Sequence, residues 1–308
     1  MLKNCLLAIS VVLIIVSIYF PARHARHYSY ILKDNISSQL KLHEPRNKLP
    51  NLKTCTYQNI ILNSEDVDIN SINERKSFQQ PLAGGEFKPK QCTASINAAI
   101  IVPYRNRTRQ LNIFLNYMHH FLQKQNIHYR IFIVDQNDTL PFNRAKMLNY
   151  GAKLAISLKY DCLILHDVDL LPLNTGNIYG CTKCPRHMSS SLDTFRYNLP
   201  YLTLFGGAVS ILSQQFQEIN GMSNKFYGWG AEDDNFYRRV IGNGLQPCRL
   251  PPEVSRYTML FHNKEKANEN RFKLLETLPE NPETDGLNSL PHPHVIKLEH
   301  LYTHLVVS

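Results

Sequence analysis

The chain has 308 residues, 43% of them hydrophobic and 19% charged, which is the composition of a globular protein and excludes global disorder. The formal net charge is +9, but the lysines and arginines are scattered, with no basic block and no interleaved aromatic repeat. This pattern argues against a nucleic-acid-binding surface, and a phosphorylated small substrate fits the charge equally well.

An uncharged, mostly aliphatic run occupies residues 5–20 and ends at Pro21. It is slightly short for a membrane span of about 20 residues, long for a signal-peptide core, and lacks a small-x-small cleavage site. We therefore expect a tail at residues 1–4 and an uncleaved signal anchor at residues 5–20. Lys3 on one side and Arg23 and Arg26 on the other leave the orientation open.

Residues 21–90 are polar and show no sustained period, so they are predicted to form a stem, partly ordered near Cys55. Seven cysteines in a chain that enters the secretory pathway favour disulfides over a zinc site. Glycosylation sequons begin at Asn35, Asn106 and Asn137. The folded body is predicted to span residues 91–308.

This body begins with alternating strand and helix patterns. Buried strands are predicted near residues 98–103, 129–134 and 162–166, with helices near 111–124 and 142–157 between them. The alternation predicts an α/β fold with a mostly parallel sheet flanked by helices. Glycine-rich dinucleotide and P-loop signatures are missing from the sequence, whereas Arg105 and Arg107 follow the first strand and suit a phosphate or diphosphate.

Two carboxylates follow the third strand, at Asp167 and Asp169. Residues spaced i and i+2 on a strand or tight turn point to the same side, so the pair could share one hard cation. Taken alone, so short a motif also describes solvated aspartates at the end of a strand.

The second half contains paired glycines at Gly206 and Gly207 and then the only tryptophan, Trp229, between two glycines. A lone aromatic on a glycine-hinged loop suits a mobile lid that stacks on a sugar. The three acidic residues after it, 232–234, also suit the N-terminus of a helix.

Together these segments resemble the β-1,4-galactosyltransferase family in order and spacing, over roughly residues 92–308. The shared motifs are Pro103–Arg107, Phe142–Lys146, Asp167–Asp169, Gly228–Asp234 and Asp285–Leu290. The resemblance implies a GT-A (nucleotide-diphospho-sugar transferase) fold in a single-pass type II Golgi membrane protein with a short cytoplasmic tail and a luminal catalytic domain. It also implies Mn²⁺, a UDP-sugar donor, inversion, and a glycan acceptor ending in β-linked GlcNAc or, in one branch, xylose.

Motif by motif, the resemblance implies a nucleotide-sugar site at Pro103, Tyr104, Arg105, Asn106, Arg107, Phe142, Asn143, Arg144, Val168, Asp169, Trp229, His262, Asn263 and Lys264. The implied metal ligands are Asp169, Met259 and His262. A thioether is an unusual ligand for a hard ion, so chemistry alone does not predict Met259.

The resemblance also implies the catalytic roles. Asp233 is expected to be the general base that accepts the proton of the acceptor 4-hydroxyl. The acceptor would be bound by Ala231, Glu232, Asp233, Asp234 and Arg271, and Trp229 would also close over the donor.

Two positions depart from the family pattern. Vertebrate galactosyltransferases carry tyrosine where this chain has Leu204, and leucine leaves room for an N-acetyl group, which makes the resemblance closest to the invertebrate β-1,4-N-acetylgalactosaminyltransferases. We therefore predict GalNAc transfer, with galactose transfer as the alternative; because one steric change shifts selectivity by only about 1–3 kcal/mol, use of both donors is compatible with it. Ala231 stands where the family usually has glycine.

Family pairing implies the disulfides Cys55–Cys92 and Cys162–Cys181, and leaves Cys184 and Cys248 open. Asn106 and Asn137 would lie beside substrate loops, so Asn35 is the sequon predicted to be glycosylated.

Two other classes remain open from the sequence: a non-catalytic, lectin-like or chaperone-like Golgi protein on a GT-A scaffold, and a secreted metal-binding adhesion module. The surviving metal ligands, base and arginines argue against the first. The expected partners are the UDP-sugar, the glycan acceptor and the Golgi membrane, but no nucleic acid. The sequence leaves open whether the acceptor is a glycoprotein or a glycolipid, and whether an accessory membrane protein is needed.

Overall fold

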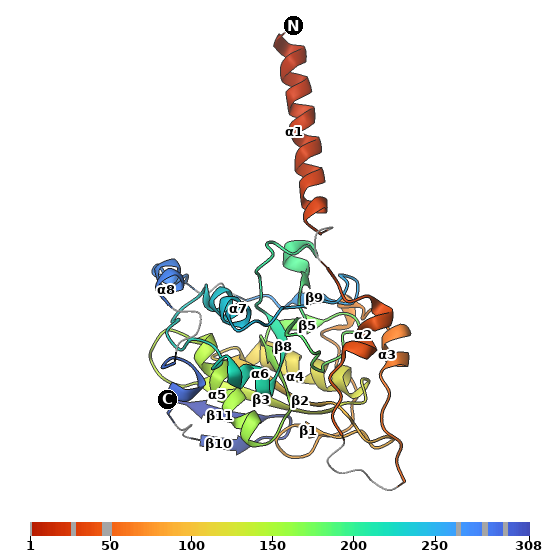
Figure 1. Ribbon diagram of the computed structural model, residues 1–308. Coiled ribbons are helices and arrows are strands. Elements are labelled where there is room, and N and C mark those ends of the chain that lie inside the picture. Colours follow the sequence, from red (N-terminus) through yellow and green to blue (C-terminus); the bar gives the residue numbers. More distant parts are fainter. Residues whose placement is uncertain (1, 26–28, 45–50, 263–265, 279–282, 292–294) are drawn as a thin grey trace.

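The computed structural model describes residues 2–25, 29–44, 51–262, 266–278, 283–291 and 295–308. A mixed sheet forms the centre of the body, in the order β10-β11-β3-β2-β4-β8-β6, with β1 paired to β3 (Figure 1). Its strands are β1 (Glu86–Phe87), β2 (Asn97–Tyr104), β3 (His128–Gln136), β4 (Cys162–His166), β6 (Arg186–His187), β8 (Ala208–Leu212), β10 (Val295–Leu298) and β11 (Thr303–Val307).

The expectation of a mostly parallel sheet is correct for its centre and wrong for its flanks. β2 runs parallel to β3 and to β4, and β11 runs parallel to β3. β1, β8 and β10 each run antiparallel to the strand they join, and β6 runs antiparallel to β8. Crossover helices fix the direction of the central strands, whereas β10 and β11 form a hairpin, which reverses direction.

Helices α4 (Thr108–Gln123) and α5 (Arg144–Ser157) lie on opposite faces of the sheet. Successive side chains of a strand point to opposite faces, and in β2 Ile100 packs in the cluster that contains Phe114 of α4, whereas Ile101 packs in the cluster that contains Met147 of α5. This alternation follows from the continuous apolar run of β2, because a strand covered on both faces has no polar side.

A small second sheet, β5-β9-β7, lies beside the end of β4; its strands are β5 (Leu170–Pro172), β7 (Ser191–Leu192) and β9 (Arg256–Met259). The remaining helices are α2 (Ile36–Gln39), α3 (Gln58–Leu62), α6 (Ser213–Glu218), α7 (Glu232–Gly242) and α8 (Arg271–Thr277), with 3₁₀ turns at η1 (Lys33–Asn35), η2 (Ile69–Ser71), η3 (Asp193–Phe195) and η4 (Leu287–Ser289).

The N-terminal helix α1 (Leu2–Ala25) projects away from the body (Figure 1), and apolar side chains such as Leu13 and Ile18 are exposed on it. Over the residues that the structure describes, no helix combines the length and the apolarity of a membrane span. The signal anchor at residues 5–20 therefore stays a prediction.

The segment expected to be a stem contributes to the core. Ile36 of α2 and Ile61 of α3 are fully buried in the same cluster as Ile100 of the sheet. In its described parts, this segment is therefore packed structure rather than a free tether.

Three disulfides cross-link the body: Cys55–Cys92, Cys162–Cys181 and Cys184–Cys248. The first two are the expected pairs, and the third settles the two cysteines that the sequence left open.

Candidate active site

Side chains with the expected chemistry gather at the carboxyl ends of β2 and β4, the edge where open α/β sheets bind ligands. Arg105 follows β2, and its Nη1 donates to the Leu140 carbonyl at 2.6 Å, while its guanidinium lies 5.3 Å from the ring centre of Phe142. These contacts join the loop after β2 to the segment that leads into α5. A flat cation and an aromatic ring on one side of the site suit a nucleotide.

The start of α5 has a structural as well as a chemical role. The side chain of Asn143 accepts a hydrogen bond from the Lys146 amide and caps the helix, while its Nδ2 donates to the Asn224 carbonyl. Asn143 is fully buried, so its side chain orders the site rather than projecting into it. Arg144 follows it in the first turn.

Arg144 pairs with Asp167, the first of the two aspartates that follow β4. Its Nε donates to Asp167 Oδ1 at 2.6 Å, its Nη2 donates to the Gly207 carbonyl at 3.3 Å, and its Nη1 lies 3.8 Å from Glu232 Oε1. Asp167 is thereby held by a charge-assisted hydrogen bond. Asp169, two residues further on, contacts a different partner.

That partner is His262, whose Nε2 lies 2.8 Å from Asp169 Oδ2. The Leu260 amide donates to the Asp169 carbonyl at 2.7 Å, and the pairing of β5 with β9 sets Met259 opposite Leu170. The three expected metal ligands therefore come from two adjoining segments. Among the described residues, no three His, Cys, Asp or Glu side chains are grouped as a metal site; here the third donor would be the thioether.

The donor set fits a divalent first-row metal, because carboxylate and imidazole in direct contact are ligands that Mn²⁺ accepts. Asp193, which the sequence did not single out, holds the strand that carries Met259. Its Oδ1 accepts the Met259 amide at 3.2 Å and its Oδ2 accepts the Thr258 hydroxyl. No spacing rule indicates Asp193, because its partners lie in a distant strand.

The expected base, Asp233, lies in the first turn of α7, against the glycine pair that precedes β8. A Cβ atom on Gly206 would lie 2.6 Å from Asp233 Oδ2, so glycine is needed to leave room for the carboxylate. Burial and the nearby charges of Glu232 and Asp234 raise the pKa of Asp233 to about 7, and Arg144 opposes this shift. A carboxyl with such a pKa suits proton transfer near neutrality.

Two further carboxylates, those of Glu232 and Asp234, lie beside this base. The Oε2 atom of Glu232 is buried and has no hydrogen-bond partner among the described residues. Asp234 accepts a hydrogen bond from Tyr201, which lies in the loop before the glycine pair. The first turn of α7 thus presents acceptor atoms that polyhydroxylated ligands can satisfy.

Trp229 lies in an exposed loop, with 60% of its surface accessible. Its amide donates to the Lys266 carbonyl and its own carbonyl accepts the Asn268 amide, so the loop is paired with the segment that leads into α8. Gly230 has a φ of 111°, and a Cβ there would lie 2.7 Å from Cδ of Arg271. The loop therefore places Gly230, the residue after Trp229, against the side chain of Arg271.

Ala231 has a φ of 70°, in the left-handed region that favours glycine. This conformation explains why glycine would be the easier residue here, and why alanine strains the junction between the loop and α7.

Leu204 is partly exposed, in the loop that leads to Gly206 and β8, and its carbonyl accepts a hydrogen bond from Arg249 at 3.1 Å. Leu204 lies two residues before Gly206, the glycine that leaves room for the Asp233 carboxylate.

Three further parts of the predicted site complete the comparison. Asn263 and Lys264 lie outside the described residues. Asp285, in the last shared motif, forms a buried ion pair with Arg239 at 3.1 Å and accepts hydrogen bonds from Ser223 and Asn224, so that motif supports the fold. Asn35 is exposed, and its glycosylation stays a prediction.

Several known proteins are similar to this chain in sequence and in fold. The family model for the N-terminal region of glycosyl transferase group 7 matches residues 47–182, and that for the N-terminal domain of galactosyltransferase matches residues 186–263. β-1,4-Galactosyltransferase 4 of Cricetulus griseus is 38% identical over 243 residues, covering 77% of this chain and 70% of the relative. β-1,4-Galactosyltransferase 6 of Rattus norvegicus is 37% identical over 264 residues, covering 85% of this chain and 68% of the relative.

Among solved structures, a mutant of Drosophila β-1,4-galactosyltransferase 7 in complex with manganese, UDP-Gal and xylobiose aligns with a TM-score of 0.59 and 28% identity, over 69% of this chain and 93% of that one. Fold and sequence thus define a glycosyltransferase with a GT-A-like fold. The chain belongs to the β-1,4-galactosyltransferase family.

Proposed function

We propose that this protein is a Mn²⁺-dependent inverting glycosyltransferase that moves GalNAc from UDP-GalNAc to the 4-hydroxyl of a terminal β-linked GlcNAc, on a glycoprotein or glycolipid. The observation that carries the proposal is the convergence on one sheet edge of the Asp169–His262 pair, at 2.8 Å, and Asp233, whose raised pKa suits a base. The similarity to β-1,4-galactosyltransferases supports the same reaction type.

In the proposed reaction, the acceptor 4-hydroxyl oxygen attacks the anomeric carbon from the face opposite UDP. Its proton passes to the Asp233 carboxylate, the bond from the anomeric carbon to the diphosphate oxygen breaks, and UDP leaves with the electron pair. A direct displacement inverts the anomeric centre and needs no enzyme nucleophile. The neighbouring carboxylates Glu232 and Asp234 would hold acceptor hydroxyls so that one oxygen faces the base.

Asp169, Met259 and His262 would hold Mn²⁺, which offsets the negative charge on the departing UDP when bound. Arg105 would contact the diphosphate, and Phe142 would flank the uridine with the edge of its ring. The guanidinium of Arg144 already contacts the Gly207 carbonyl and the carboxylates of Asp167 and Glu232. We infer that Arg144 holds the acidic groups apart as much as it binds phosphate.

Leu204 carries the donor assignment. A leucine has no hydroxyl for the 2-position of the sugar and leaves more space there than tyrosine, so an N-acetyl group is accommodated. Galactose transfer from UDP-Gal to the same acceptor is the alternative, supported by the activity named for the relatives. A non-catalytic role would require that these site residues serve only binding.

The test is turnover by the purified full chain with Mn²⁺ and a β-GlcNAc glycoside, with UDP-GalNAc and UDP-Gal offered separately. A larger kcat/KM for UDP-GalNAc supports the proposal. Faster transfer from UDP-Gal would replace the donor assignment, and UDP binding without transfer from either donor would support the non-catalytic alternative.

We further propose that residues 5–20 anchor the protein in the Golgi membrane as a single-pass type II protein with a luminal catalytic body. The sequence pattern of the run and the secretory character of the three disulfides support this topology. Protection of the body from protease in sealed Golgi vesicles, lost on detergent treatment, would test it.

A further inference from the structure

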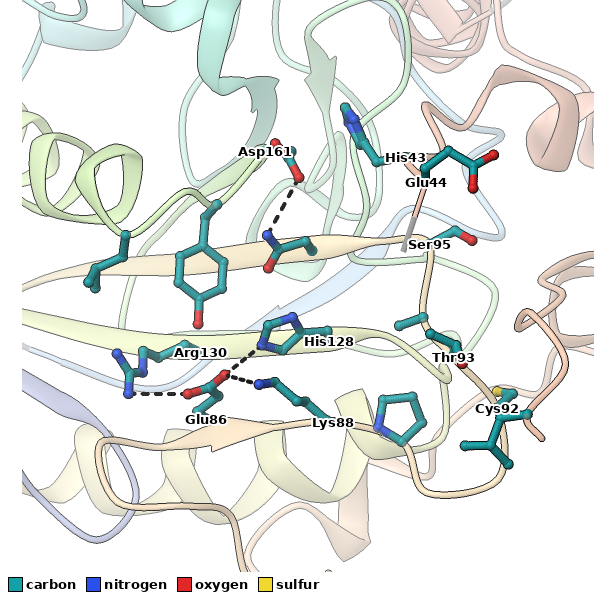
Figure 2. Close-up of a pocket in the computed structure, with 16 residues that line it drawn as sticks. His43, Glu44, Glu86, Lys88, Cys92, Thr93, Ser95, His128, Arg130 and Asp161 are labelled. Carbon is teal, nitrogen blue, oxygen red and sulfur yellow. Dashed lines mark hydrogen bonds and ion pairs between the residues drawn. The ribbon is translucent and has the colours of Figure 1, made fainter. Parts of the chain in front are cut away.

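A pocket lies at the opposite end of the sheet from the candidate active site. Its volume is about 400 Å³, and it is lined by the starts of β2 and β3, by β1, by the turn before β4 and by residues near His43 (Figure 2). β2 runs the length of the sheet between the two sites, and its eight residues span roughly 25 Å at about 3.3 Å per residue. One sugar ring therefore cannot contact both sites.

The pocket wall contains an unusual share of polar atoms that lack partners. Among the residues that the structure describes, nine buried side-chain nitrogen or oxygen atoms have no hydrogen-bond partner, and four belong to residues of this pocket. They are His43 Nε2, Thr93 Oγ1, Asn97 Oδ1 and Arg130 Nε. Buried polar groups are normally paired, so their concentration here indicates that a partner is missing.

Charges in the pocket are balanced rather than of one sign. Glu86 forms ion pairs with Lys88 at 3.1 Å and with Arg130 at 3.3 Å, and its Oε1 lies 2.8 Å from His128 Nε2, as Figure 2 shows. Asp161 lies across the pocket from this group in the same view. A free phosphate or sulfate would meet carboxylates as well as cations, which disfavours a simple anion site.

An apolar surface accompanies these charges. The ring of Tyr160 lies 5.6 Å from that of His128, centre to centre, and Pro89 and Leu158 also line the pocket. Aromatic side chains with a polar edge give a ligand both an apolar contact and a hydrogen bond. Pockets of about 300–1,000 Å³ that combine apolar walls with a few placed polar groups are typical ligand sites.

We propose that this pocket binds one saccharide unit of a glycan, independently of the catalytic edge. A sugar hydroxyl both donates and accepts hydrogen bonds, so it can pair with the exposed Lys88 ammonium and, after a small shift of the wall, with the buried Asn97 Oδ1 and Arg130 Nε atoms. The C–H face of the sugar would pack against Leu158, which is 44% exposed. The pocket would hold a second branch of a glycan or a neighbouring glycan, while another branch reaches the active site.

The experiment is saturation-transfer NMR on the full chain in a polyoxyethylene detergent, with the methyl glycosides of galactose, N-acetylglucosamine, mannose and fucose as probes. The double variant Lys88→Ala/Thr93→Val removes one charged donor and one hydroxyl from the pocket. Lys90→Ala is the matched control, because Lys90 is also exposed but does not line the pocket. Trp229→Ala disables the lid of the catalytic edge.

We expect at least one glycoside to bind with an affinity that Trp229→Ala and Lys90→Ala leave unchanged, and that the double variant lowers about tenfold, the effect of losing a hydrogen bond to a charged group. The double variant should keep its turnover of UDP-sugar, which shows that it is folded. The proposal would be overturned if the double variant bound every probe as tightly as the unaltered protein does. It would also be overturned if no probe bound the unaltered protein. Displacement of the glycoside by inorganic sulfate would identify an anion site instead and would also overturn it.

Discussion

Nε2 of His262 lies 2.8 Å from a carboxylate oxygen of Asp169, although the two residues come from segments far apart in the sequence. The antiparallel pairing of β5 with β9 brings them together, because β5 begins directly after Asp169 and β9 ends three residues before His262. Ligands for a metal are thus brought together by strand pairing, and the residues that fix this pairing should affect metal affinity.

Asp193 holds Thr258 and Met259 of β9 through its carboxylate, so Asp193→Ala should weaken Mn²⁺ binding. The substitution frees the Met259 amide and the Thr258 hydroxyl, and loss of such supporting hydrogen bonds typically lowers metal affinity about 10–100-fold. The measurement is the electron paramagnetic resonance signal of free Mn²⁺, titrated with protein in the absence of donor and acceptor. Asp193→Asn keeps one acceptor oxygen and serves as the control; equal affinity in both variants would refute a positioning role.

Asp233→Asn should lower kcat by about 10²–10⁴-fold, the usual contribution of a general base, because the amide cannot accept the hydroxyl proton. Binding of UDP should change little, since Asp233 lies in α7 and we propose that it contacts the acceptor rather than UDP. Single-turnover kinetics and UDP titration separate the two effects. A variant that lost UDP binding to the same degree as turnover would show that Asp233 supports structure rather than proton transfer.

The raised pKa of Asp233 predicts the pH dependence of the reaction. A base must be deprotonated to act, so kcat should rise with pH up to about 7 and level off above it. Tyr201, Arg144, Glu232 and Asp234 surround this carboxyl, and Glu232 raises its pKa. Glu232→Gln should therefore move the acidic limb to lower pH, although it also weakens acceptor binding; an unmoved limb in kcat would assign that limb to another group.

The raised pKa of Asp233 also makes the free energy of unfolding depend on pH. The folded protein holds the proton of Asp233 more tightly than the unfolded chain does, because the pKa is raised from 3.8 to about 7. Between these pH values the folded state binds more protons, so this group's contribution to the free energy of unfolding falls as the pH rises. In Asp233→Asn, urea unfolding measured from pH 4 to pH 7 should lose that decline.

Leu204→Tyr should shift the donor preference toward UDP-Gal. Tyrosine fills the space beside the 2-position and adds a hydroxyl, so the ratio of kcat/KM for UDP-Gal over UDP-GalNAc should rise by about 10–200-fold, equivalent to roughly 1–3 kcal/mol. Leu204→Ile keeps the wall apolar and is the matched control. An unchanged ratio in the tyrosine variant would show that donor choice is made elsewhere in the site.

The sequence predicted the central elements well because their signals are local. The continuous apolar run of β2 reflects burial of both faces of the strand, and the helical period of α4 reflects burial of one face of the helix. The direction of β8 was missed, because no crossover helix determines it. The packing of Ile36 and Ile61 was also missed, since short helices in a polar segment carry too few apolar residues to show a period.

For the site, motif spacing predicted the residues that would contact ligands but not those that hold them in place. Asp193 and Gly206 act through partners in other elements, and only the folded structure brings those partners close. The strain at Ala231 was likewise invisible, because a residue's φ is set by its surroundings as well as by its type.

The most direct test of the central claim is the linkage of the product. The purified chain would be incubated with UDP-GalNAc, a β-GlcNAc glycoside and Mn²⁺, and the product analysed by two-dimensional NMR, with an EDTA-treated sample beside it. We predict a β-linked GalNAc on the 4-oxygen of GlcNAc, formed only in the sample with metal. A product with an α linkage, or equal yield after EDTA treatment, would contradict inverting transfer at the Asp169–His262 site.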